Sequence, residues 1–151
     1  MKTTEQLVRE LADREAIHDL CARYCDCVWR KDLDGLVGLF VKDGSFAVEG
    51  LEVEALSRGH AKLKQVYQKA FTELDARLLL HNHVIELLDG ERATGRCYVQ
   101  VFTAKSSTKW VGLGYYEDEY ARSGDLWKFA SRHYFLDVID TDVSLRKTFM
   151  V

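Results

Sequence analysis

Four residues of this sequence have the chemistry that proton transfer requires: Tyr24, His81, His83 and Arg132. An unperturbed histidine titrates at about pH 6.5, so His81 or His83 is suited to accept a proton at neutral pH. Tyr24 can donate a hydroxyl proton, and the guanidinium of Arg132 can stabilise negative charge that develops on a substrate. Catalysis by such a histidine would fall below about pH 6, where the imidazole becomes charged.

The two histidines lie two residues apart in a strand-like segment, so a regular strand would place both on one face. They could act as a base or as part of a metal site, but no third ligand is evident, and we expect no metal. The other face of this segment would carry Leu78 and Asn82. A β-bulge could reverse this assignment.

Aromatic residues of the C-terminal half are the other candidates for a binding site. Arg132 and Tyr134 share one face of the last strand-like segment and could bind a carbonyl or carboxylate group. Tyr98 and Tyr116 are candidates for lining a pocket or a dimer surface, between which the sequence does not decide. The aromatic residues of opposite parity in the last segment are expected to pack: Trp127, Phe129 and Phe135.

The N-terminal part of the chain has helical periodicity. Residues 14–30 carry an apolar stripe in which Ile17, Tyr24 and Val28 fall on one side of a helix. Thr3 and Gln6 have the spacing of a capping box at its start. After a break at residues 31–32, Asp32 can cap a short second helix, and residues 59–71 predict a third.

From residue 77 onwards the apolar period changes to two, which predicts long strands over residues 77–88, 92–104, 109–121 and 126–137. Asp89-Gly90 is a strong hairpin signal between the first two. A shorter strand is predicted over residues 45–48. Three helices followed by strands in hairpin order predict an α+β domain, in which the helices pack on a strongly curved antiparallel sheet. The tail, residues 138–151, could cover the open end of the sheet or a neighbouring subunit.

Composition limits the class of protein. A chain of 151 residues, 47% of them hydrophobic, predicts one domain over residues 1–151, with residues 1–10 as a helical lead-in. The net charge is −3 without a basic stripe, so we expect no nucleic-acid or membrane partner. No signal-peptide pattern or run of 18 apolar residues is present, which favours a cytoplasmic location. The spacing of the four cysteines does not match structural zinc patterns and predicts free thiols.

Several short motifs resemble those of SnoaL-like proteins, a cone-shaped, cystatin-like α+β superfamily that includes nuclear transport factor 2, scytalone dehydratase, bile-acid 7α-dehydratase and hexachlorocyclohexane dehydrochlorinase. Residues 14–20 read REAIHDL, residues 32–40 read DLDGLVGLF, and residues 43–46 read DGSF. Residues 57–60 (SRGH), 84–90 (VIELLDG) and 124–129 (GDLWKF) fit as well. The resemblance covers roughly residues 11–137 and implies the fold, which hosts many chemistries.

The resemblance also implies a pocket between the helices and the concave face of the sheet. In the enzymes, an Asp near the end of the first helix and a His on the first long strand form a dyad, and these positions hold Trp29 and Leu78 here. Trp29, Leu78 and Asn82 are therefore expected to line the pocket. Tyr24 matches a tyrosine of the bile-acid dehydratase, although it equally fits a core aromatic.

Three functions remain open. The first is a cofactor-independent lyase or isomerase that acts by proton transfer on a small apolar or aromatic molecule. We expect no cofactor, because the sequence contains no glycine-rich phosphate-binding loop. The second is a non-catalytic small-molecule-binding protein, favoured by the missing dyad. The third is a structural partner subunit that resembles the small subunit of ring-hydroxylating dioxygenases. Aromatic residues on both faces of the strands further predict a homodimer, because a second subunit would cover the outer ones.

Overall fold

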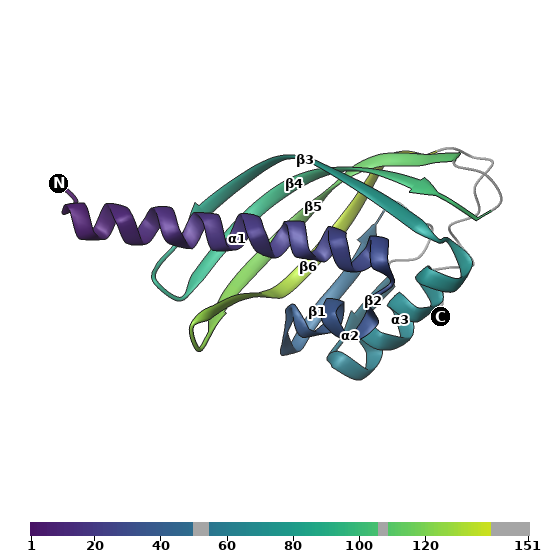
Figure 1. Cartoon of the computed structure of the whole chain (residues 1–151), viewed down its shortest axis with the longest axis horizontal. Coiled ribbons are helices and arrows are strands. Elements are labelled where there is room, and N and C mark those ends of the chain that lie inside the picture. Colours follow the sequence, from purple (N-terminus) through teal and green to yellow (C-terminus); the bar gives the residue numbers. More distant parts are fainter. Residues whose placement is uncertain (50–54, 106–108, 140–151) are drawn as a thin grey trace.

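One long helix, α1 (Thr4–Arg30), lies along the concave side of a curved sheet (Figure 1). The structure, a computed structural model, describes residues 1–49, 55–105 and 109–139. Two shorter helices, α2 (Leu33–Gly38) and α3 (His60–Glu73), lie beside the C-terminal end of α1. The strands in these ranges are β1 (Phe40–Glu49), β2 (Ala55–Arg58), β3 (Ala76–Leu87), β4 (Arg92–Thr103), β5 (Lys109–Ser123) and β6 (Leu126–Ile139).

Helix α1 begins and ends where side-chain chemistry dictates. Thr3 Oγ1 accepts a hydrogen bond from the Gln6 amide at 3.2 Å, and Gln6 Oε1 accepts one from the Thr3 amide at 2.8 Å. The predicted capping box is thereby confirmed. Lys31 ends the helix in the left-handed region, with φ of 57°. Asp32 then caps α2, as predicted, by accepting from the Gly35 amide at 2.9 Å.

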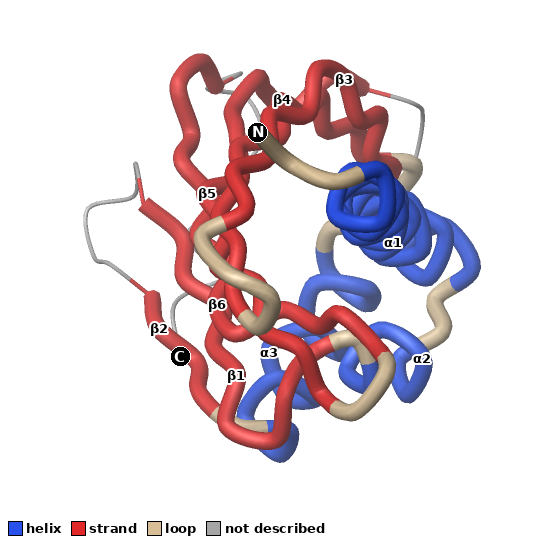
Figure 2. Tube along the Cα trace, turned by 90° about the vertical axis from the view of Figure 1, so that its left-hand side faces the viewer, coloured by secondary structure: helices blue, strands red, loops and turns tan. Residues whose placement is uncertain are grey.

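The strands form one sheet in the order β2-β1-β6-β5-β4-β3, and Figure 2 shows them curving in an arc that the helices close. The predicted α+β class, with three helices packed on a strongly curved sheet, is confirmed. One pair departs from the antiparallel prediction, because β1 runs parallel to β6. The chain reaches β6 only after α3 and the β3–β5 meander, so no hairpin joins β1 to β6. Of the predicted tail, residues 138 and 139 end β6, and residues 140–151 lie outside the described residues.

Two irregularities change which residues face inward. The β3–β4 register shifts between Leu80 and His83, so His83 and Ile85 follow Leu78 onto the concave face. A second shift, between Glu119 and Tyr120 of β5, lies opposite residues 129–131 of β6. As a result Phe129 and Arg132 both face the core and are buried. In a regular strand, residues three apart would lie on opposite faces.

The core fills the space between α1, α3 and the concave face of the sheet. From α1 it takes the predicted stripe of Ile17, Leu20, Cys21, Tyr24 and Val28. All four cysteines are free, as the sequence predicts. None of the described helices is long and apolar enough to cross a bilayer.

Candidate functional site

An apolar cavity of about 50 Å³ lies within the cone, between α3, the C-terminal half of α1 and the sheet. Its wall is almost entirely apolar, and the polar side chains among its lining residues are all tyrosines. The lining residues are Tyr24, Val28, Phe46, Tyr67, Ala70, Phe71, Leu74, Ala76, Leu78, Val101, Val111, Tyr116 and Tyr134. Every helix and strand except α2 and β2 contributes at least one lining residue, so the cavity depends on the whole folded domain.

Four of the lining residues are tyrosines, and their hydroxyls differ in how they are satisfied. The hydroxyl oxygens of Tyr24 and Tyr67 are 3.1 Å apart, and the Tyr116 hydroxyl interacts with that of Tyr24. The Tyr134 hydroxyl is buried and has no hydrogen-bond partner among the described residues. Burial raises the pKa of all four phenols, so they remain protonated donors at neutral pH.

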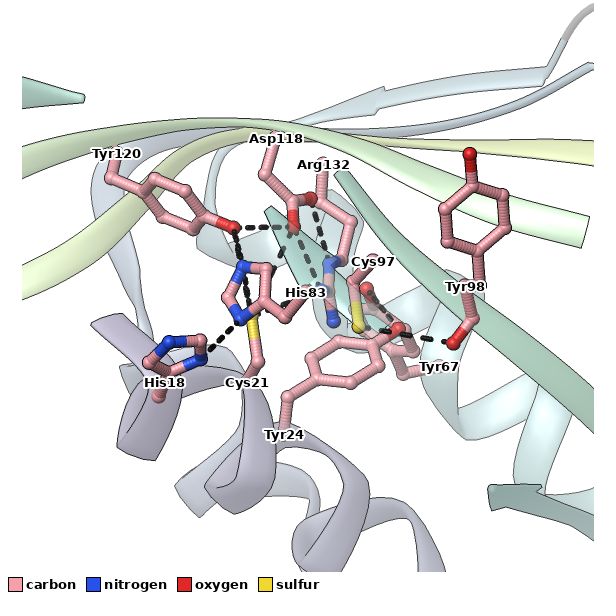
Figure 3. Close-up of polar contacts among 10 residues, drawn as sticks. All are labelled: His18, Cys21, Tyr24, Tyr67, His83, Cys97, Tyr98, Asp118, Tyr120 and Arg132. Atoms are coloured by element: carbon pink, nitrogen blue, oxygen red, sulfur yellow. Dashed lines mark hydrogen bonds and ion pairs between the residues drawn. The ribbon is translucent and has the colours of Figure 1, made fainter. Parts of the chain in front are cut away.

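A chain of polar side chains, which we call the polar network, lies between the middle of α1 and the sheet (Figure 3). Its centre is a bidentate ion pair, in which Nε and Nη2 of Arg132 each donate to the Asp118 carboxylate at 2.9 Å. Both side chains are completely buried. The guanidinium carbon also lies 4.2 Å from the ring centroid of Tyr24 and 3.9 Å from that of Tyr116. The ring centroid of Phe129 lies 4.3 Å from the same carbon, so the positive charge is held between a carboxylate and three aromatic rings.

The hydrogen bonds of the polar network fix the tautomer of His83. Tyr120 donates its only hydroxyl proton to Asp118 at 2.8 Å, so its oxygen accepts from Nε2 of His83 at 3.0 Å. Nδ1 of the neutral imidazole is then an acceptor, and Nδ1–H of His18 donates to it at 3.0 Å. Burial, followed by the proximity of His18, lowers the pKa of His83 to about 4. His83 is accordingly neutral at physiological pH.

Cys21 completes the polar network. Its sulfur lies 3.4 Å from Nη2 of Arg132 and 3.6 Å from the Tyr120 hydroxyl. Burial raises the pKa of this thiol to about 12, so it is a protonated packing residue, not a nucleophile. Among the described residues, no three His, Cys, Asp or Glu side chains gather in a metal-binding arrangement.

The structure separates the predicted site residues into three groups. Tyr24, Leu78, Tyr116 and Tyr134 line the cavity. Arg132 and His83 lie in the adjacent polar network and are not among the lining residues. The predicted cluster of Tyr24, histidine and Arg132 around one substrate is therefore divided between two neighbouring regions.

The third group is turned away from the cone. The pocket positions expected for Trp29 and Asn82 and the catalytic position of His81 are wrong, whereas Tyr98 takes the outer of the two positions left open for it. Trp29 is 45% exposed, because it lies beyond the edge of the α1 stripe. Its Nε1 donates to the Leu78 carbonyl at 2.7 Å, which holds the indole against β3. His81 and Asn82 are exposed at the β3 bulge, which turns only His83 inward. Tyr98 is 41% exposed on the outer face, where it contacts Tyr115.

Three residues of the polar network were missed. Tyr116, Asp118 and Tyr120 share one face of β5. A carboxylate on the same face as buried aromatic residues indicates a charge that is paired inside the protein. His18 is exposed, and its contact with His83 exists only because of the β3 bulge, which no local signal reveals.

Comparisons with known proteins agree on the fold. A family model described as a SnoaL-like domain matches residues 9–133. A protein of unknown function from Mycobacterium tuberculosis is 28% identical, with a TM-score of 0.80, over 93% of this chain and 82% of that one. An NTF2-like protein with a cystatin-like fold from Novosphingobium aromaticivorans is 25% identical, with a TM-score of 0.75, over 97% and 96% of the two chains.

A third similar structure is an enzyme. The hexachlorocyclohexane dehydrochlorinase LinA-type3 from Novosphingobium barchaimii has a TM-score of 0.76 over 88% of this chain and 92% of that one. At 19% identity, this likeness shows the shared fold alone. A comparison with curated proteins found no match.

Proposed function

The chain belongs to the family of SnoaL-like domains, and we propose that it binds a small, largely apolar or aromatic molecule inside the cone without transforming it. The observation that carries this proposal is the chemistry of the cavity wall. Of the lining residues, none is a carboxylate or an imidazole, and the four tyrosines are protonated. Such a wall can hold a ligand and donate hydrogen bonds to it, but it offers no base.

The position of Leu78 supports the same reading. Where the resemblance implies a catalytic histidine, this chain places an aliphatic side chain that is 5% exposed and lines the cavity. Trp29, at the position implied for the catalytic aspartate, lies outside. These two positions therefore supply neither the aspartate nor the histidine of the expected dyad to the cavity.

The size of the cavity sets the scale of the ligand. Its volume of about 50 Å³ is more than a buried water needs. It is smaller than the cavity of roughly 150 Å³ that admits benzene in an engineered protein core. A ligand with an aromatic ring therefore requires some lining side chains to shift outward.

The test is a titration with benzene followed by methyl NMR. Binding in the cone should shift the methyl signals of Val101 and Val111, which line the cavity. Ala70→Leu adds three carbons to the wall and should abolish these shifts. Ala61→Leu makes the same change on the exposed side of α3 and should leave them intact. Shifts that persist in Ala70→Leu would contradict binding at this site.

A second candidate is proton-transfer catalysis by a lyase or isomerase, favoured by the inward position of neutral His83. Both of its nitrogens are occupied by His18 and Tyr120, so a substrate would have to displace one of them. Exchange of deuterium into a small enolisable ketone tests this candidate. The exchange should be lost in His83→Ala and kept in His81→Ala. With a pKa of about 4, His83 would remain a base well below pH 6, the limit expected from an unperturbed imidazole.

We also propose a homodimer formed through the outer face of the sheet. Tyr98 is 41% exposed there, and the rings of Tyr115 and Phe135 stack at 5.0 Å beside it. A second copy would cover these rings. Light scattering at micromolar concentration should give a dimer, and Tyr115→Glu should give a monomer. Co-purification with a different catalytic subunit, in place of self-association, would favour the partner-subunit alternative.

A further inference from the structure

The hydroxyl of Tyr134 is an unusual feature of the cavity wall. It is a buried donor without a hydrogen-bond partner among the described residues, in a side chain that is only 5% exposed. Leaving a buried hydroxyl unsatisfied costs free energy, and such a cost is recovered when a ligand supplies the missing acceptor. The other three lining hydroxyls interact with one another, whereas that of Tyr134 neither donates nor accepts a hydrogen bond among the described residues.

The backbone around Tyr134 is built to hold its ring in this position. Gly114 of β5 lies beside it, and a Cβ at Gly114 would come within 2.7 Å of Cε2 of Tyr134. The ring also contacts that of Tyr116, with centroids 5.1 Å apart. The hydroxyl is therefore held by packing against the neighbouring strand, not by a polar partner.

The charges near the cavity are already balanced. Arg132 is the nearest buried cation to the tyrosines, and Asp118 neutralises it through two hydrogen bonds. Its Nη1 has no hydrogen-bond partner among the described residues, but Arg132 is not part of the cavity wall. An anionic ligand would thus be buried without a free cation beside it, which is unfavourable.

From these contacts we propose that Tyr134 is the polar anchor of the cavity, and that the ligand is a neutral molecule with one oxygen acceptor on a small apolar body. Phenols, aldehydes and ketones belong to this class. The ligand oxygen accepts a hydrogen bond from the Tyr134 hydroxyl, while the apolar body contacts side chains such as Leu78 and Val101. This inference rests on the proposed binding function and adds the chemical class of the ligand.

Benzene, phenol and benzoate form a matched set of probes, because they share a ring and differ in the group attached. Their dissociation constants would be measured by methyl NMR on the wild-type chain, on Tyr134→Phe and on Tyr98→Phe, which removes an exposed outer hydroxyl. We expect phenol to lose about fivefold in affinity relative to benzene in Tyr134→Phe, the size of one neutral hydrogen bond. Tyr98→Phe should leave that ratio unchanged, and benzoate should bind at least about tenfold more weakly than phenol in the wild type.

The other outcomes separate this inference from the function on which it rests. If benzene and phenol bind in the cavity with the same ratio in wild type and Tyr134→Phe, the anchor is wrong and the binding function stands. If benzoate binds as tightly as phenol, the neutral class is wrong, and Nη1 of Arg132 becomes the group that recognises the ligand. If none of the three probes shifts the cavity methyl signals, both proposals are wrong.

Discussion

The cavity and the polar network lie side by side in the same cone, yet they treat polar groups in opposite ways. In the cavity, four hydroxyls line an apolar space and one of them has no partner among the described residues. In the polar network, Arg132 is bound by Asp118 through two nitrogens, and Asp118 also accepts from Tyr120. The change from one region to the other takes two residues along β5, from Tyr116 to Asp118. The cavity inside the cone therefore lies where no charged side chain lines the wall.

This difference indicates distinct roles for the two regions. A charge pair that is fully buried is held in one geometry by its own electrostatics, and it has little freedom to exchange a partner for a substrate. An apolar wall with hydroxyl donors can adapt to a guest at lower cost. We therefore expect substitutions in the polar network to change stability, and substitutions in the cavity wall to change binding as well.

The largest effect is expected from Arg132→Met, which leaves the Asp118 carboxylate buried without its cation. Breaking a buried ion pair from one side typically costs about 3–5 kcal/mol of unfolding free energy. Chemical denaturation would measure the loss. Adding Asp118→Leu to the variant should restore much of it, because no buried charge then remains.

The matched control for this change is Arg96→Met on the outer face. Arg96 pairs with Glu117, but both side chains are about half exposed, at 48% and 45%. An exposed pair contributes about 0–1 kcal/mol. Equal losses in the two variants would show that the Arg132 pair is not buried as the structure describes.

In the cavity wall, Leu78→Ala should cost about 2–5 kcal/mol, because it removes buried methyl groups beside an existing void. The same substitution at Leu79, which is 44% exposed on the other face of β3, should change stability by less than about 1 kcal/mol. Unlike the Arg132 variant, Leu78→Ala should also bind benzene more tightly, because the enlarged cavity admits a ring without rearrangement. Calorimetric unfolding and the benzene titration check both parts.

Within the polar network, His83 should make the stability of the protein depend on pH. Its folded pKa of about 4 lies below the ordinary value of 6.5, so the unfolded chain takes up a proton first as pH falls. The contribution of His83 to the free energy of unfolding is thus greatest above pH 6.5, decreases between pH 6.5 and 4, and does not change further below pH 4. We expect a loss of about 1–2 kcal/mol over this window, reduced from the full shift because the ring is partly exposed.

Denaturation midpoints between pH 7 and pH 4 would measure this effect. His83→Gln should flatten the decrease, whereas His81→Gln, on the exposed side of the bulge, should not. Carboxylates such as Asp13, whose pKa is lowered, add their own loss at the acid end. The difference between each variant and the wild type removes that shared contribution. An unchanged slope in His83→Gln would place the pH dependence elsewhere.

The fold could be predicted because its signals are local. Helix boundaries follow from Thr3, Gln6 and Asp32, and the hairpin at Asp89-Gly90 fixes the pairing of β3 with β4. The face of each strand was harder, because parity was assumed to run unbroken. The β3 bulge inserts a residue into a stretch that no Gly or Pro marks, and only long-range pairing with β4 decides its position.

The site was accordingly predicted in part. Tyr24, Leu78, Tyr116 and Tyr134 lie on regular segments, where the α1 stripe or strand parity places them inside. Asn82 and His83 lie at the bulge, so unbroken parity with Leu78 placed both on the wrong faces. Asp118 was not predicted, because its burial depends on the pairing with Arg132 across β5 and β6, which is a long-range contact.

The smallest effect is expected from Trp29→Asp, and it tests the boundary of the cavity. Had Trp29 lined the cone, this change would have enlarged the cavity and placed a carboxylate in it. The indole is instead 45% exposed and is held by its bond to the Leu78 carbonyl and by Arg77, whose Cζ lies 5.5 Å from the ring centroid. Losing these contacts should cost about 1 kcal/mol, as expected for one hydrogen bond and one exposed cation–π pair. The dissociation constant for benzene should stay within twofold of the wild type, because the wall beneath is formed by Leu78 itself. A larger change in binding, with the same fold by NMR, would mean that the cavity extends outward past Leu78 to the surface of α1.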